Sequence, residues 1–218
     1  MFSYESGKKF AIFGVILSFL VVIGGVVLNI VLPMVYREAM VKDPLETLNS
    51  INGFMNVYYG AANTLAFALM ALGFFCMFNE ERDVSLLITT AAIVVAALPN
   101  IVRIFGGDIS PTGIASSLGL EGVMGTIVIL LGSVIYSAYI ALFAVHSFKN
   151  GNAFLGILLA LTFIWSAFGF IAIMMVQASG NTYGREASAM VAGIMGIVSF
   201  IINVVTTVIK VIHISKDY

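Results

Sequence analysis

The stretch FAIFGVILSFLVVIGGVVLNIVLPMVY, residues 10–36, decides the fold because it holds no charged side chain over 27 positions. An α-helix needs about 20 apolar residues to cross a hydrocarbon core about 30 Å thick, so this stretch predicts a membrane span. Lys8 and Lys9 before it resemble the start of a secretory signal. The apolar part is much longer than the core of about 7–15 residues in such a signal. We therefore expect an uncleaved anchor from Phe10 to Tyr36.

Five further apolar stretches are each long enough to cross a bilayer as a helix. They are Phe54 to Phe78, Val84 to Phe105, Gly122 to Ser147, Ala153 to Gln177 and Ala187 to Val211. None of them shows the alternating pattern of an outer-membrane strand. The sequence thus predicts an all-α, polytopic integral membrane protein with six transmembrane helices. We expect residues 1–218 to form a single six-helix transmembrane domain.

The composition supports the same class. Hydrophobic residues make up 61% of the 218 residues, charged residues only 10%, and the mean hydropathy is +1.08. Soluble domains carry about 25% charged residues, so a water-soluble globule is excluded and most of the surface must face lipid. With a net charge of −1 and no basic stripe, nucleic-acid binding is excluded. The expected partners are the lipid bilayer and other membrane proteins or a second copy of the chain.

Two short polar links indicate how the spans are paired. NEERD (residues 79–83) joins the second and third spans, and KNGN (residues 149–152) joins the fourth and fifth. Links this short imply antiparallel neighbours, so we expect three helical hairpins. The link after the third span, GGDISPTGIASSLGLEG (residues 106–122), is rich in glycine, serine and proline. Such composition favours a mobile segment or a partial cap over the bundle.

The link after the first span predicts a short interfacial helix. DPLETLNSING begins with Asp43 as N-cap and Pro44 at the first helical position, and Glu46 completes a capping box. Asn52 and Gly53 read as a stop signal. We expect a helix that ends there and lies in the membrane interface; a plain capped connector is the alternative.

The distribution of basic residues predicts the orientation. With six spans both termini share one side, where Lys8, Lys9, Arg82, Lys149, Lys210 and Lys216 fall, against Arg37, Lys42, Arg103 and Arg185 on the other. Lysine and arginine near span ends favour the cytoplasm. We therefore expect a cell (plasma) membrane protein with both termini cytoplasmic.

Two groups of polar residues within the spans are candidate ligand-binding sites. Asn100 and Arg103 share a helix face after Pro99 and predict a polar notch for an anion, a carboxylate or a lipid headgroup. Alternatively, Arg103 reaches the interface and pairs with Asp108. The second group, Tyr136, Tyr139, Trp165 and Asn203, predicts a weakly polar cavity between the fourth, fifth and sixth spans. Helix packing and interhelical hydrogen bonding are the alternatives for this group.

Small residues recur at four-residue spacing and predict faces where helices approach closely. These stripes are Gly60, Thr64 and Ala68; Ser133, Ser137 and Ala141; Gly156 and Ala160; and Ser188, Ala192 and Gly196. The span amides Asn29, Asn63, Asn203 and Gln177 are expected to form interhelical hydrogen bonds, because hydrocarbon offers them no partner. The stripes pack either within one chain or against a partner.

The sequence lacks the residue patterns of known membrane chemistry. Its two histidines, His146 and His213, stand at inner helix ends, where a basic group suits the helix dipole. There is no HExxH, no P-loop, no mid-span acid and no lysine inside a span for a Schiff base. We therefore expect no enzyme activity, no cofactor, no metal and no ion-coupled pumping.

Two functions remain open. The first is a membrane-embedded small-molecule binding or transport subunit that holds a small or amphipathic ligand and acts with a partner protein. The alternative is a structural or accessory subunit of a multi-protein membrane complex without its own ligand chemistry.

Cysteines introduced beside Arg82 and Lys149 should react with an impermeant thiol reagent only after the cytoplasmic side is exposed. One beside Lys42 should react in intact cells, because the two ends of a span lie on opposite sides of the membrane. Labelling of the Lys149 position from outside would reverse the predicted orientation.

Overall fold

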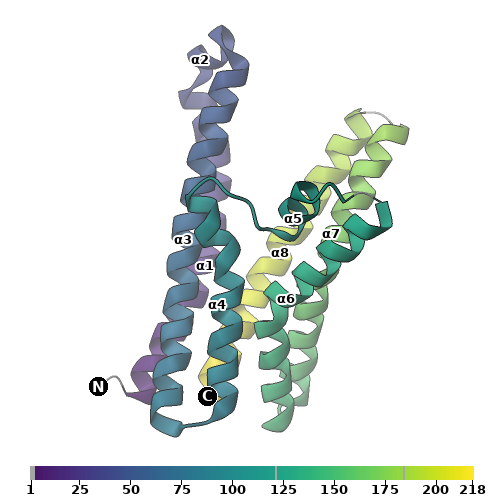
Figure 1. Cartoon of the computed structure of the whole chain (residues 1–218). Coiled ribbons are helices and arrows are strands. Elements are labelled where there is room, and N and C mark those ends of the chain that lie inside the picture. Colours follow the sequence, from purple (N-terminus) through teal and green to yellow (C-terminus); the bar gives the residue numbers. More distant parts are fainter. Residues whose placement is uncertain (1–2, 121, 184) are drawn as a thin grey trace.

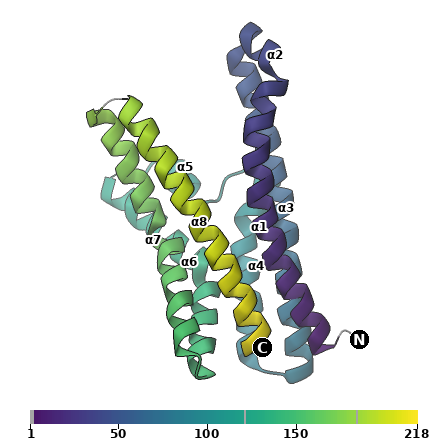
Figure 2. The ribbon, with the colours of Figure 1, turned by 180° about the vertical axis from the view of Figure 1, so that it is seen from behind.

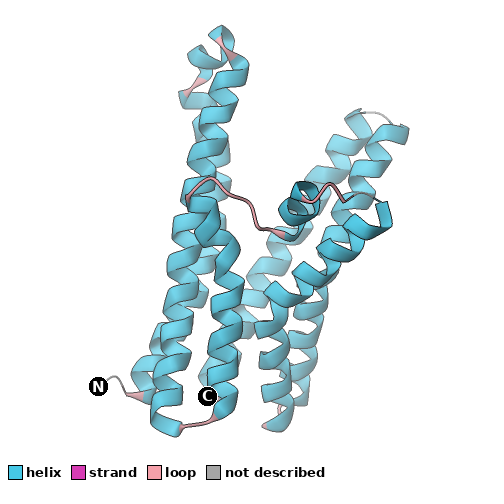
Figure 3. Cartoon of the chain, viewed as in Figure 1, coloured by secondary structure: helices cyan, strands magenta, loops and turns pink. Residues whose placement is uncertain are grey.

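The structure is a computed structural model that describes residues 3–120, 122–183 and 185–218. The side chains of residues 122, 169–193, 195 and 217 are outside this description. Every regular element in the described ranges is an α-helix, as Figure 3 shows. The expected all-helical class is therefore confirmed. Full helicity is the physical consequence of a chain whose backbone polar groups find no water in lipid.

The described part of the chain contains six long helices and two short ones. They are α1 (Tyr4–Val35), α2 (Arg37–Lys42), α3 (Pro44–Glu81), α4 (Val84–Ile104), α5 (Pro111–Ser117), α6 (Gly122–Lys149), α7 (Ala153–Tyr183) and α8 (Arg185–Asp217). Among the described residues, five helices are long and apolar enough to cross a membrane: α1, α3, α4, α6 and α8. In α7, the apolar part with described side chains is shorter, Ala153–Phe168.

The predicted short interfacial helix is wrong in its end point. Asp43 does cap the helix, since its carboxylate accepts a hydrogen bond from the backbone N–H of Glu46 at 3.1 Å, and Pro44 is the first helical residue. The helix then continues through Asn52 and Gly53 as part of the 38-residue α3. A glycine costs a helix interior only about 1 kcal/mol, which the long apolar segment on its C-terminal side readily offsets. The separate short helix in this region is α2, before Asp43.

The helices form two arms. The N-terminal arm consists of α1 to α4 and the C-terminal arm of α5 to α8; α1 packs on α3, α3 on α4, α6 on α7 and α7 on α8. The expected pairing across the two tight links is thus confirmed for α3–α4 and α6–α7. Figures 1 and 2 show the arms in contact near the two chain ends and diverging toward α2. Contacts of α4 with α6 and of α1 with α8 join them.

Within the N-terminal arm, glycines let α1 and α3 approach very closely. A Cβ atom built on Gly73 would lie 2.5 Å from the backbone oxygen of Gly7 and 2.5 Å from the backbone nitrogen of Ala11. A Cβ on Gly14 would lie 2.6 Å from the backbone oxygen of Ala66. Close backbone approach of this kind is a main source of helix association in lipid. The stripes expected from the sequence did not include this pair of helix faces.

An aromatic seam joins the two arms. We use this name for Phe67 and Phe74 of α3 with Tyr139 and Phe143 of α6. The rings of Phe74 and Phe143 are stacked with centroids 5.3 Å apart, and the ring of Tyr139 meets Phe67 and Phe143 edge to face. Phe74 and Phe143 are fully buried. Such ring pairs contribute about 0.5–1.5 kcal/mol each beyond the burial of their area.

The described outer surface of the long helices is largely apolar. Large side chains such as Leu20 and Ile30 of α1, Leu65 of α3 and Leu131 of α6 are more than half exposed. A soluble protein does not expose contiguous apolar area on this scale. Together with the five candidate spans, this surface defines a helical membrane protein in contact with lipid.

Replacing Gly73 by alanine should destabilise the protein by about 1–3 kcal/mol, because the new methyl group meets the backbone of α1 and forces the helices apart. Gly53→Ala is the matched control: nothing described lies within 4 Å of the new Cβ, so the helix should gain about 0.5–1 kcal/mol. Thermal unfolding in detergent micelles measures both. Equal melting temperatures for the two variants would contradict the close packing of α1 and α3.

Candidate ligand-binding pocket

A polar face runs along the last part of α8. Asn203, Thr206, Thr207, Lys210 and His213 recur every three or four residues, so they share one side of the helix. Elsewhere this part of α8 is apolar, with Val205 and Val208 half exposed. A polar stripe on an otherwise apolar membrane helix points into the bundle rather than to lipid.

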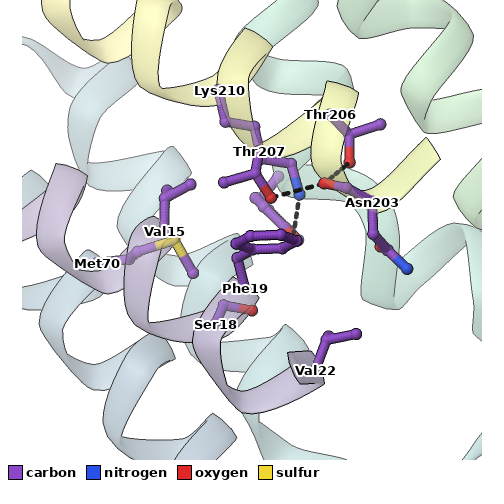
Figure 4. Close-up of a pocket in the computed structure, with 10 residues that line it drawn as sticks. Val15, Ser18, Phe19, Val22, Met70, Asn203, Thr206, Thr207 and Lys210 are labelled. Atoms are coloured by element: carbon purple, nitrogen blue, oxygen red, sulfur yellow. Dashed lines mark hydrogen bonds between the residues drawn. The ribbon is translucent and has the colours of Figure 1, made fainter. Parts of the chain in front are cut away.

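This face borders a pocket between the two arms, with a volume of about 50 Å³. Its lining residues come from α1, α3, α6 and α8: Val15, Ser18, Phe19, Val22, Met70, Tyr139, Asn203, Thr206, Thr207 and Lys210. Figure 4 shows Lys210 and Thr207 of α8 directed toward Phe19 of α1 across this space. One wall is therefore polar, and the opposite wall, from α1, is mostly apolar.

Lys210 carries the charge of the pocket. Its Nζ donates a hydrogen bond to the hydroxyl oxygen of Tyr139 at 3.1 Å and lies 5.2 Å from the centre of that ring. Tyr139 is buried and fixed in the aromatic seam. Among the described residues, Lys210 has no carboxylate partner, and no acidic residue lines the pocket. The pocket therefore holds a cation whose counter-charge the described chain does not supply.

The threonine hydroxyls serve the helix itself. Thr207 Oγ1 donates to the backbone oxygen of Asn203 at 2.7 Å, and Thr206 Oγ1 donates to the same oxygen at 3.2 Å. The Asn203 side chain is exposed at the edge of the pocket. The groups with donor capacity toward the pocket are thus the Lys210 ammonium, the Tyr139 hydroxyl, the Ser18 hydroxyl and the Asn203 amide.

A histidine cluster lies one turn further along α8. His213 is fully buried, and its Nδ1 is 2.7 Å from Ser147 Oγ in α6. The His146 ring stacks on Tyr218 at 4.0 Å, and Phe143 of the aromatic seam contacts the His213 ring at 4.9 Å. The sequence placed both histidines only as basic groups at helix ends. Burial of His213 makes it part of the contact between α6 and α8 instead.

The structure brings together only part of the second group of candidate residues. Tyr139 and Asn203 line the same pocket. Trp165 lines a different hollow of about 310 Å³ between α7 and α8, which is almost entirely apolar and shares only Thr206 with the lysine pocket. Where the sequence predicted one cavity between the fourth, fifth and sixth spans, the structure has two hollows on different sides of α8.

Tyr136 belongs to neither hollow. Its hydroxyl donates a hydrogen bond to the backbone oxygen of Ile109 at 3.0 Å. Ile109 lies in the link between α4 and α5, and α5 packs on α6 (Figure 1). Tyr136 thus anchors the glycine-rich link against the C-terminal arm.

Asn100 and Arg103 stand near the end of α4, apart from the lysine pocket. The backbone of Asn100 packs against Gly60 of α3, where a built Cβ would lie 2.9 Å from its oxygen. Hydrogen bonds from Ser110, and to a smaller extent the charge of Arg103, hold the pKa of Asp108 below its usual range. The electrostatic relation between Arg103 and Asp108 agrees with the alternative reading of Arg103 as an interfacial residue.

Two expectations from the sequence need correction. Lys210 was grouped with the inner-end cations and no lysine was expected inside a span, yet it lies within the apolar part of α8 and lines the pocket. The three-to-four spacing of the α8 polar residues was the available signal. Asn29 does not bond between helices either: its Nδ2 donates to the Gly25 oxygen of its own helix at 3.0 Å. The Gln177 side chain lies outside the described residues.

The fold and the pocket define the class: a helical membrane protein with a lysine-bearing hollow between two helical arms. No protein-family model, no curated protein and no solved structure matches the chain. Function is therefore inferred from the residues of the pocket.

Tyr136→Phe should loosen the link between α4 and α5, because the Ile109 oxygen loses its side-chain donor. A hydrogen bond of this kind contributes about 1 kcal/mol, so limited proteolysis should nick residues 105–121 several-fold faster. Tyr139→Phe, which leaves that hydrogen bond intact, is the matched control. Unchanged cleavage in Tyr136→Phe would show that the link is held by other contacts.

Proposed function

We propose that the protein is a membrane-embedded binding or transport subunit that holds a small or amphipathic molecule between its two arms and acts with a partner protein. The single observation that carries this proposal is the Lys210 pocket. A charged side chain inside a membrane helix is costly and marks a ligand or ion path more often than a packing site. Here the charge faces a hollow and is held in place by a buried tyrosine.

The position of the pocket supports a transport role. It lies where α1 of one arm meets α8 of the other, and the arms diverge beyond it (Figure 2). Sites of membrane transporters lie between structural units whose relative movement opens them to either side. The sequence contains no P-loop for binding a nucleotide, so in this proposal a partner protein supplies the energy for any driven movement.

We further propose that α7 is the sixth span, that the spans form three hairpins, and that both termini are cytoplasmic at the plasma membrane. The length of α7, 31 residues, and its position between two candidate spans support this topology. Both chain ends lie at the same end of the molecule in Figures 1 and 2, as an even number of spans requires. The excess of basic residues at that end favours the cytoplasmic side.

The accessory-subunit function is kept as a second candidate because of Gly196. No described atom lies within 4 Å of a Cβ built on this residue, so its face of α8 is open toward the described part of the chain. A small residue on an open helix face allows another helix to approach closely. In that function the contact with a partner helix, and not the lysine pocket, is essential.

Native mass spectrometry of protein purified in mild detergent should detect a bound small molecule on the single chain. Lys210→Met should lose that mass, because the ligand loses its charged donor; Lys216→Met, an exposed lysine two turns on, should retain it. If instead the chain carries a partner protein that dissociates in Gly196→Leu and persists in Lys210→Met, the accessory function replaces the proposed one.

A further inference from the structure

Resting on the proposed binding function, we propose that the Lys210 pocket takes a carboxylate, the head of a small or long-chain monocarboxylic acid. The pocket offers a single cation, a pair of donor groups and one apolar wall. Each of these features excludes some classes of ligand.

Charge excludes cations and disfavours neutral ligands. Lys210 supplies an ammonium group, and none of the described residues that line the pocket is an acid. In a low-dielectric interior an unpaired charge is costly, and an anion brought by a ligand removes that cost. A cationic ligand would add to the existing charge. The ligand that gains most from this site is therefore an anion.

The donors are arranged to hold more than one oxygen atom. Lys210 has three ammonium hydrogens, and the one directed at Tyr139 leaves two. Because Tyr139 accepts that bond, its own hydroxyl hydrogen is directed elsewhere, and no described group accepts it. Two donors side by side, 3.1 Å apart at their heavy atoms, match the two oxygens of a carboxylate. Hydrogen bonds to an ionised acceptor are about twice as strong as neutral ones.

The single charge of the pocket separates a carboxylate from a phosphate. A phosphate monoester carries a charge of about −1.5 to −2 at neutral pH, whereas a carboxylate carries one negative charge, and Lys210 is the one cation among the described lining residues. Val15 and Phe19 of α1 and Met70 of α3 provide apolar contact for the first carbons of an aliphatic tail. Asn203 at the exposed edge marks the open side, where the rest of a tail would leave.

The test compares ligands that share one tail and differ in the head. Hexanoate, hexyl phosphate and 1-hexanol are titrated into the full chain in lipid nanodiscs, with binding followed by calorimetry. Hexanoate should bind saturably, at least about 10-fold more tightly than either of the others, because only its head matches both the single positive charge of Lys210 and the pair of donors. Equal affinity for hexanol or for hexyl phosphate overturns the proposal.

Substitutions in the pocket test whether hexanoate binds there. Lys210→Met should weaken hexanoate about 10- to 100-fold, and Tyr139→Phe several-fold. Lys210→Arg keeps the charge and should retain most of the affinity, and Lys216→Met should bind as wild type. Thermal unfolding of each variant separates loss of binding from loss of folding. Wild-type affinity in a folded Lys210→Met protein overturns the assignment to this pocket.

Tail length distinguishes the two sources of the carboxylate. Tighter binding of dodecanoate than of hexanoate assigns the pocket to fatty acids, and equal or weaker binding assigns it to small carboxylates; both outcomes support the proposed head group.

The same titrations separate failure of the carboxylate assignment from failure of the binding function. If hexanol binds as well as hexanoate, only the carboxylate assignment is wrong and the binding function stands. If none of the probes binds and native mass spectrometry finds no bound small molecule, the proposed function itself fails.

Discussion

The junction between the two arms is the constraint on which the pocket depends, and the stacking of Phe74 on Phe143 lies within it, beside the contacts of α4 with α6 and of α1 with α8. The stacking ties α3 to α6, and thereby one arm to the other, at the end where both chain ends lie. Tyr139 continues the aromatic seam, so the tyrosine that receives Lys210 is held by the same packing that joins the arms. The pocket exists because the arms are fixed below it and separate above it.

Four threonine hydroxyls in the spans are satisfied within their own helices. Thr64, Thr89, Thr90 and Thr162 each donate to the backbone oxygen four residues earlier, at 2.6–2.9 Å. A hydroxyl that donates to its own helix does not donate to a neighbouring helix or to a ligand. The Lys210 pocket differs in this respect. Lys210 and Tyr139 join two helices by a side-chain hydrogen bond, whereas the threonines stabilise only their own helix.

The sequence predicted what depends on local pattern. Long apolar runs and tight polar links follow from the thickness of the bilayer and the reach of the chain, so the helices and the pairing of α3 with α4 and α6 with α7 were predictable. Gly53 was misjudged because a stop signal competes with the propagation of a long apolar helix. Tyr136 and Trp165 were misplaced because depth within a span does not specify which neighbour a side chain faces. The place of Lys210 in the pocket was not predicted, because the residue lies near the end of its span and was counted with the basic residues there. Its seven-residue spacing from Asn203, which puts both residues on one helix face, was not used.

The helix α3 runs without interruption and is longer than a bilayer is thick. At 1.5 Å per residue, 38 residues extend over about 57 Å, whereas a bilayer with its headgroups measures about 40–45 Å. An upright rod of this length is longer than the bilayer is thick, so in that orientation its first turns, with α2 beside them, would project as a stalk into the water. Arg37, Glu38, Lys42 and Asp43 give that stalk the charged tip that an aqueous environment requires.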